Sequence, residues 1–496
     1  MADTMTEMRS ELSRGTRRRF LWEMGAGFAG VALNGMLQQD GFFAQASAAG
    51  RQSTGFEHPM APQAPHFAPR AKACIFLFMY GGPPSMDTWD YKPELQRRDG
   101  QKATIELRRR YKREGTLLAS RQEFRRYGKS GLWCANSFPH IAKHMDELCV
   151  IKSLYADTFA HGSALIQMNS GRVIQGSPTI GSWLTYGLGS ENQNLPGYIV
   201  MLDPRGGPIS GAANWSSGFM PAAYQGTNLR SKGDPILDLS PKIQLTRRMQ
   251  RETIDTLARL NAKHMESRIG YSELPARIAS YELAYQLQTA APEVMDVSNE
   301  DQRTLEMYGL FEPKPKEKKS IGPQTFGQQC LTARRLVERG VRFVQIYSGG
   351  GHGAENWDAH GNVEKNLAIH APEIDKPIHG LLTDLKQRGL LDETLVVWGG
   401  EFGRQPTSQG SGGRDHNAKG FLYWLAGGGV KGGHSHGETD PLGHEAAVDR
   451  HHIRDLHSTI LHLMGLDHHK LTYFYGGLDH RLTGVEEAEV IHDLIA

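Results

Sequence analysis

Eight consecutive apolar residues, Ala73 to Tyr80, end at the pair Gly81-Gly82 and constrain the fold more than any other feature. A run this continuous has no polar face to turn toward solvent, so it predicts a strand buried on both sides, as in the centre of a parallel sheet. Shorter runs of similar character follow at Leu148 to Ile151, Val341 to Ile346, Leu395 to Trp398 and Phe421 to Leu425.

Helical patterns alternate with these strands at 325–338, 366–387 and 453–464, and a glycine suited to end a helix follows each one. Strands alternating with helices predict an α/β fold, a three-layer sandwich with a mostly parallel central sheet. We also expect a polar helical stretch at about 97–128. Three helices opened by Ser240-Pro241, Ser272 and Ser298 predict a helical insertion at about 205–320.

The N-terminus has the pattern of an export signal. Arg17 and Arg18 precede Phe20-Leu21 and a modestly apolar stretch from Met24 to Leu37, followed by small residues at 44–48 that suit a signal peptidase. This pattern resembles a twin-arginine signal, which carries folded proteins across a membrane; the alternative is a basic tail beside an amphipathic helix. We therefore expect a signal peptide at 1–48, a Pro-rich linker at 49–70, one domain at 71–496, and a periplasmic or extracellular location.

Composition limits the classes of partner. The net charge of +2 lacks the basic excess that nucleic-acid binding requires, so nucleic acid is not an expected partner. No apolar run in the mature chain approaches the ~20 residues of a membrane-spanning helix. The four cysteines have no C-x-x-C spacing, and a bridge between Cys134 and Cys149 stays open. Sixteen of the 22 histidines lie at or after His352, which directs attention to that part of the chain.

Side chains that can bind a metal follow several of the predicted strands. In parallel sheets the loops at the carboxyl ends of the strands meet at one edge, where ligands bind. These loops hold the groups Asp87 and Asp90; His352, Asp358 and His360; Glu401 and Arg404; and Arg414, Asp415 and His416. Mixed oxygen and nitrogen ligands predict a divalent ion, zinc, manganese or calcium. Two alternatives remain: Asp87 caps a turn, or Arg404 or Arg414 neutralises Glu401 without a metal.

The joint order of several motifs is similar to that of one bacterial family. The motifs are Phe76 to Asp87, His161-Gly162-Ser163-Ala164 leading to Ser170-Gly171, Asn356 to Asn362, Gly400 to Arg404, Gly413 to His416 and Asp455 to Gly465. Together with the export signal they resemble the family called domain of unknown function 1501, within the alkaline phosphatase-like and sulfatase-like superfamily. The resemblance covers about residue 70 to the C-terminus and implies the α/β sandwich fold of that superfamily.

The resemblance also implies roles for individual residues. Asp358, His360 and Glu401 match the metal-binding positions, with Asp87 as the first acid after the first strand. Relatives usually have Asp-His-Gly where this chain has Glu401-Phe402-Gly403, so Asp415 and His416 are the candidates to replace the missing ligand. His161 falls where sulfatases have a modified Cys or Ser, with Ser163 two residues on. No C-x-P-x-R or S-x-P-x-R sequence occurs, which excludes a formylglycine sulfatase.

Two functions follow from this comparison. The leading one is an exported metal-dependent hydrolase of small phosphate or sulfate esters or of sulfated or phosphorylated glycans. Ser163 is one candidate nucleophile, and His161 is a metal ligand, a general acid or the nucleophile. In it, Arg404 or Arg414 holds the anionic group of the substrate. The alternative is a catalytically silent protein that binds an anionic glycan or a partner protein at the same edge.

The export hypothesis predicts that changing both Arg17→Lys and Arg18→Lys leaves the protein in the cytoplasm, because the translocase reads the paired guanidinium groups. Cell fractionation of the native host measures this directly. A double variant exported as fully as the wild type would contradict the twin-arginine signal.

Overall fold

The computed structural model describes residues 59–108, 111–230, 236, 245–266, 273–313, 315–317, 319–351 and 355–496. The predicted signal peptide at 1–48 and the first part of the linker lie outside these ranges. Residues 59–70, the rest of the predicted linker, are hydrogen-bonded to the domain: Arg70 N donates to Leu463 O at 2.8 Å and Gln63 N to Leu188 O at 2.9 Å.

A central sheet organises the part of the chain that the structure describes. Its strands run in the order β14-β6-β13-β10-β1-β9-β7-β8, with β17 also paired to β6. The bounds are β1 (Ala73–Met79), β6 (Leu148–Tyr155), β7 (Tyr198–Met201), β8 (Thr227–Asn228), β9 (Phe343–Ser348), β10 (Thr394–Gly399), β13 (Phe421–Ala426), β14 (His434–His436) and β17 (His451–His452). All five predicted strands are present, and the mostly parallel α/β sheet is confirmed.

One predicted strand runs against the others. β13 pairs antiparallel with both β10 and β6, so it is an exception within the mostly parallel sheet. β6 is nevertheless parallel to β10, because the two strands are separated by one reversed strand. Each β13 residue is as buried as those of the parallel strands, and an apolar run therefore carries no signal of strand direction.

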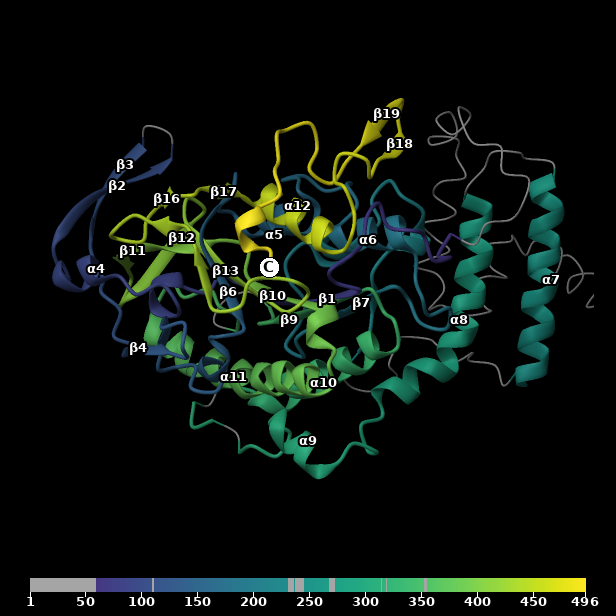
Figure 1. Cartoon of the computed structure of the whole chain (residues 1–496), viewed down its shortest axis with the longest axis horizontal. Coiled ribbons are helices and arrows are strands. Elements are labelled where there is room, and N and C mark those ends of the chain that lie inside the picture. Colours follow the sequence, from purple (N-terminus) through teal and green to yellow (C-terminus); the bar gives the residue numbers. More distant parts are fainter. Residues whose placement is uncertain are drawn as a thin grey trace, which may run out of the picture.

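Helices cover both faces of the sheet, as Figure 1 shows. β1 explains why: Ile75, Leu77 and Met79 point into one apolar core, while Phe76 and Phe78 point into another. The first core packs against α10 (Pro323–Glu338) and α11 (Val363–Gln387). The second packs against α5 (His161–Ser170), α6 (Ile180–Leu188) and α12 (Ile453–Leu463). The three-layer sandwich and the helices predicted at 325–338, 366–387 and 453–464 are confirmed.

The helical stretch expected at 97–128 was wrong. After the short helix α4 (Pro93–Arg97), the chain forms two antiparallel hairpins, β2 (Lys102–Arg108) with β3 (Tyr111–Thr116) and β4 (Phe124–Tyr127) with β5 (Leu132–Ala135). The first hairpin projects from the body of the molecule in Figure 1. Opposite charges face one another across it, as in the Glu106–Lys112 pair. Cross-strand pairing has therefore outweighed the helix propensity of these long polar side chains.

The region at 205–320 contains the three predicted helices, α7 (Arg247–Glu266), α8 (Glu273–Met295) and α9 (Gln302–Met307). Its first part also supplies β8, which extends the central sheet beside β7. Smaller pairs complete the fold: β11 (Gly403–Gln409) with β12 (Gly413–Asn417), β15 (Glu438–Thr439) with β16 (Ala446–Val448), and β18 (Tyr473–Tyr475) with β19 (Leu478–His480).

Cys134 and Cys149, whose pairing the sequence left open, are both buried free thiols, as are Cys74 and Cys330. Among the helices within the described ranges, none combines the length and the apolar character needed to cross a bilayer.

A histidine pair under the sheet predicts acid sensitivity. His379 on α11 lies 2.8 Å from His144, and burial, together with the nearby His144 and Lys143, lowers the pKa of His379 to about 4. The unfolded chain takes up this proton near the ordinary pKa of about 6.5, so the free energy of unfolding should fall as the pH decreases from 6.5 to 4. Because the ring is partly exposed to solvent, we expect His379→Gln to remove about 1–2 kcal/mol of that fall. Chemical denaturation at several pH values measures it. The exposed His469→Gln is the control, and an unchanged pH dependence in His379→Gln would contradict the assignment.

Candidate active site

Four parallel strands deliver the candidate residues to one edge of the sheet. β6 leads into His161 at the start of α5, and β1 leads into Gly81 and Gly82. β9 is followed by the loop that carries Asp358 and His360, and β10 by Glu401. The carboxyl ends of parallel strands meet at the same edge, which is why residues 240 positions apart come into contact here.

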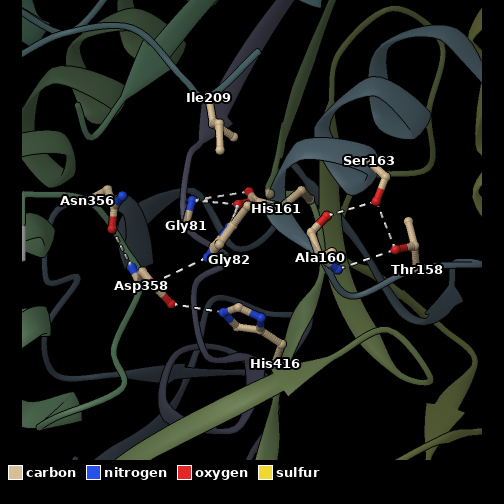
Figure 2. A network of polar contacts seen from close by, with 12 residues as sticks. Gly81, Gly82, Thr158, Ala160, His161, Ser163, Ile209, Asn356, Asp358 and His416 are labelled. Carbon is tan, nitrogen blue, oxygen red and sulfur yellow. Dashed lines mark hydrogen bonds and ion pairs between the residues drawn. The ribbon is translucent and has the colours of Figure 1, made fainter. Parts of the chain in front are cut away.

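Three histidines and one carboxylate form a compact cluster. One ligand-type atom each of His161, Asp358, His360 and His416 lies within 4.8 Å of the others. His360 Nε2 is 2.8 Å from His416 Nε2, and Asp358 Oδ1 is 3.0 and 3.1 Å from these two nitrogens. His161 Nε2 lies 3.3 Å from Asp358 Oδ2. Figure 2 shows the side chains of His161, Asp358 and His416 turned toward one another. We call these four residues the rim cluster.

Glu401 holds the ring of His161 in the rim cluster. Its carboxylate has no exposure to solvent and accepts the backbone N–H of Gly81 on both oxygens, at 2.9 and 3.1 Å. It also contacts Nδ1 of His161 at 2.6 Å, which leaves Nε2 of that ring directed toward Asp358. Gly81 has a φ of +114°, and a Cβ there would lie 2.5 Å from the backbone nitrogen of Asp358. Only glycine therefore permits this approach of the two loops.

Two opposing effects act on the pKa of His161. Burial lowers its pKa, but the hydrogen bonds and charges of Asp358 and Glu401 outweigh burial and raise it to about 9. Nε2 is buried and lacks an aligned hydrogen-bond partner, although Asp358 is near. A buried nitrogen facing a carboxylate without a directed hydrogen bond is an atom to which a cation can bind.

The imidazole of His360, in the loop after β9, faces the imidazole of His416 on β12. His360 Nδ1 contacts Gln409 Oε1 at 2.5 Å, which orients the ring and leaves Nε2 for the rim cluster. Asp358 raises the pKa of His360, whereas burial lowers the pKa of His416. His416 also packs against the Phe402 ring, with centroids 4.4 Å apart.

The donor set of the rim cluster fits a divalent ion. Three imidazole nitrogens and one carboxylate are the ligands that zinc and similar ions take in proteins. Ligand atoms around a tetrahedral zinc ion are about 3.3 Å apart, close to the separations of 2.8–3.3 Å between the paired atoms here. His360 also has the outer support, through Gln409, that metal-binding histidines usually have.

Arg404 is buried behind Asp358 and is not available to hold a substrate. Its Nη2 donates to Asp358 Oδ1 at 2.6 Å and to Gly81 O, while Nε donates to Gly82 O and Nη1 to Arg414 O. Its side chain has no solvent exposure. Where the sequence suggested a contact with the anionic group of a substrate, the structure shows the charge of Arg404 compensating Asp358.

Arg414 and Asp87 form a separate buried ion pair. Arg414 donates to both carboxylate oxygens of Asp87, at 2.7 and 3.1 Å, and its third nitrogen donates to Gln405 O. Both side chains are essentially without solvent exposure. Arg414 therefore cannot hold a substrate anion, and Asp87 lies outside the rim cluster, bound to arginine where the sequence suggested a metal ligand.

Two other candidate residues also lie outside the rim cluster. Asp415 accepts the backbone N–H of His416 at 2.9 Å and is about one-third exposed, with Arg113 4.0 Å away. The hydroxyl of Ser163 lies 3.1 Å from Thr158 Oγ1 and donates to Ala160 O; Figure 2 shows this group on the side away from Asp358. His352 lies outside the described residues.

Some contributing residues were not identified as such in the sequence. Asn356 accepts the backbone N–H of Asp358 at 3.0 Å and so fixes the turn that presents the carboxylate. An Asn two residues before an Asp is a recognisable turn signal. Gln409 gave no such signal, because only the β11–β12 pairing brings it to His360.

A family model described as "Protein of unknown function (DUF1501)" matches residues 71–495. The chain belongs to this family. The resemblance noted in the sequence is therefore confirmed. A comparison with curated proteins found no match.

Several solved structures are similar to this chain. They include the PsFucS1 sulfatase from Pseudoalteromonas sp., with 13% identity over 84% of this chain and 72% of that one and a TM-score of 0.35. The phosphonate monoester hydrolase SpPMH from Silicibacter pomeroyi has 14% identity over 66% and 68%, with a TM-score of 0.30. The alkaline phosphatase from the Antarctic bacterium TAB5 has 12% identity over 80% and 99%, with a TM-score of 0.34.

The Asp87–Arg414 pair predicts a large loss of stability without loss of metal. Asp87→Ala leaves a buried guanidinium uncompensated, so we expect the free energy of unfolding to fall by about 3–5 kcal/mol. Asp415→Ala, a partly exposed neighbour, is the matched control and should change it by less than about 0.5 kcal/mol. Denaturant unfolding and metal analysis of both variants measure the two properties. A fall in metal content in folded Asp87→Ala would mean that Asp87 contributes to the metal site.

Proposed function

We propose that this protein is an exported, metal-dependent hydrolase of phosphate or sulfate esters and a member of the alkaline phosphatase-like superfamily. The observation that carries the proposal is the rim cluster, in which three imidazoles and a carboxylate from three separate parts of the chain converge at the carboxyl edge of a parallel sheet. Within it, the buried Nε2 of His161 lacks an aligned hydrogen-bond partner, and a cation bound there would remove that cost.

His161, Asp358, His360 and His416 would hold the ion, whether zinc, manganese or calcium. When bound, the ion supplies a Lewis acid that polarises an ester oxygen and lowers the pKa of water. The donor set, with three nitrogens, favours zinc or manganese over calcium, which prefers oxygen ligands.

The chain's own residues position this chemistry. Glu401 and Gly81 fix the ring of His161, and Gln409 fixes that of His360. Arg404 compensates the charge of Asp358. The first turn of α5, whose first N–H groups have no partner within the helix, faces the same edge and favours an anionic ester group.

Water is the attacking group that we propose. Ser163 is turned toward Thr158 and Ala160, and His161 is engaged with two carboxylates, so neither of these two candidate nucleophiles is free beside the rim cluster. In hydrolysis, a bond forms between the water oxygen and phosphorus or sulfur, the ester bond breaks, and the alcohol leaves with a proton.

The alternative function, a silent protein that binds an anionic glycan or a partner protein, has one observation in its favour. Arg404 and Arg414 are both internal, so neither can provide the guanidinium fork that anion-hydrolysing sites often use. Metal content and activity decide between the two functions.

Periplasmic or extracellular location is part of the proposal. Its support is the paired arginine and apolar stretch of the N-terminus, and the Arg17→Lys and Arg18→Lys experiment tests it.

Replacing a ligand tests the proposed function. Asp358→Ala and His360→Ala should each lower metal affinity and ester hydrolysis by at least about 100-fold, because loss of outer supports alone costs 10–100-fold. Ser163→Ala should keep both. A screen of phosphate monoesters, phosphate diesters and sulfate esters with several divalent ions, alongside metal analysis, provides the measurement.

Thermal melting with and without a chelator is the companion experiment. A ligand bound only by the native state raises stability by mass action, so removal of the ion should lower the Tm of the wild type by more than that of Asp358→Ala, which has lost a ligand of the rim cluster. An identical wild-type Tm with and without chelator, together with severe damage from Arg404→Ala, would show that Arg404 alone neutralises the site and would overturn the proposal.

A further inference from the structure

A second group of metal-type side chains lies at the edge strand β14 and shares no residue with the rim cluster. His434 Nε2 and His436 Nδ1 both lie 2.9 Å from Oδ2 of Asp493, which belongs to the 3-10 helix η8 (His492–Leu494). We propose that His434, His436 and Asp493 bind a divalent transition-metal ion of the zinc type.

The backbone brings these three side chains together before any ion is bound. His434 and His436 are two residues apart on a strand, so they point to the same face, and β14 is held in parallel pairing with β6. Asp493 is fixed because Lys431 N donates to Leu494 O at 2.8 Å and Ala496 N donates to Gly429 O. The site is therefore preorganised by main-chain hydrogen bonds on both sides.

A chain of contacts connects Asp493 to Asp455 through the rings of His436 and His451. His436 Nδ1 faces Asp493, His436 Nε2 faces His451 Nε2 at 3.0 Å, and His451 Nδ1 faces Asp455 Oδ2 at 3.5 Å. The first two separations are hydrogen-bond distances, whereas the third is too long for a well-formed hydrogen bond.

An ion on Nδ1 of His436 is compatible with these contacts. His436 then donates from Nε2 to His451, and His451 donates from Nδ1 toward Asp455, whose neighbour Glu489 lies 3.9 Å from the same nitrogen. That nitrogen is buried and has no hydrogen-bond partner. In this arrangement the carboxylate of Asp455 supports His451, and His451 supports the ligand His436. Metal-binding imidazoles commonly receive such outer support.

The surroundings suit a zinc-type ion with one open position. Two imidazole nitrogens and a carboxylate oxygen are suitable ligands, and a fourth position is left for water. Lys431 Nζ lies 3.1 Å from Oδ1 of Asp493, so it compensates that oxygen and leaves Oδ2 for the ion. Asp493 is about half exposed, which gives an ion a path from solvent.

Zinc binding to a variant that lacks the rim cluster tests this inference. In the background Asp358→Asn with His360→Gln, we expect one molar equivalent of zinc per chain after equilibrium dialysis, with zinc–nitrogen distances of about 2.0–2.1 Å by X-ray absorption. Adding His434→Gln and His436→Gln, or Asp493→Asn alone, should remove that equivalent. His469→Gln is the matched control and should keep it, because this histidine is exposed and its ring nitrogen Nδ1 contacts Arg481.

The outcomes separate this inference from the proposed function. If only the rim cluster binds zinc, the wild type loses its ion in the Asp358→Asn background and the inference is overturned. If only the β14 site binds zinc, the wild type keeps one equivalent that Asp493→Asn removes, and the proposed function fails instead. Should neither the wild type nor the background variant bind zinc, the inference is also overturned. Circular dichroism checks that each variant is folded. If the His434→Gln and His436→Gln variant does not fold, Asp493→Asn provides the test with a single substitution.

Discussion

The burial of Glu401 is the constraint on which the site depends. A carboxylate with no solvent exposure must be fully compensated, and the partners it takes come from the ends of two other strands. Gly81, directly after β1, supplies a backbone N–H to both oxygens, and His161, reached from β6, supplies Nδ1. One buried charge thus sets the approach of the loop after β1 and the orientation of the His161 ring, and this in turn directs Nε2 of that ring toward Asp358.

Much of the fold could be predicted from apolar runs because burial on both faces leaves no choice of side-chain polarity. The run at Ala73 to Tyr80 became the central strand for this reason. The same argument could not give the direction of β13, since direction depends on the connections rather than on burial. It also could not give the hairpin at 102–116, whose charged residues have ordinary helix propensity and form strands through pairs such as Glu106 with Lys112.

The site was predictable to the extent that it depends on topology. Asp358, His360, Glu401 and His416 follow strands or lie in the hairpin after β10, and the sheet brings them together. What the sequence could not give is which charge pairs with which. Asp87 and Arg414 are 327 residues apart, and Asp87 is removed from the group of metal ligands only because that guanidinium reaches it in the folded chain. Asp415 and His416 are consecutive residues of β12, so their side chains lie on opposite sides of that strand, and only His416 joins the rim cluster.

The internal position of both arginines changes how an anionic ester would be recognised. Arg414 and Asp87 cancel each other, and Asp415 faces Arg113, so neither pair adds charge to the site. When His161 is neutral, as it is when bound to an ion, the remaining charges are the carboxylates of Asp358 and Glu401 and the guanidinium of Arg404, which sum to one negative charge. A divalent ion held by the rim cluster would reverse that sign to one positive charge, in a setting where partial burial strengthens its field. Attraction for a phosphate or sulfate group would then come from the ion and the start of α5, and no free arginine is needed for it.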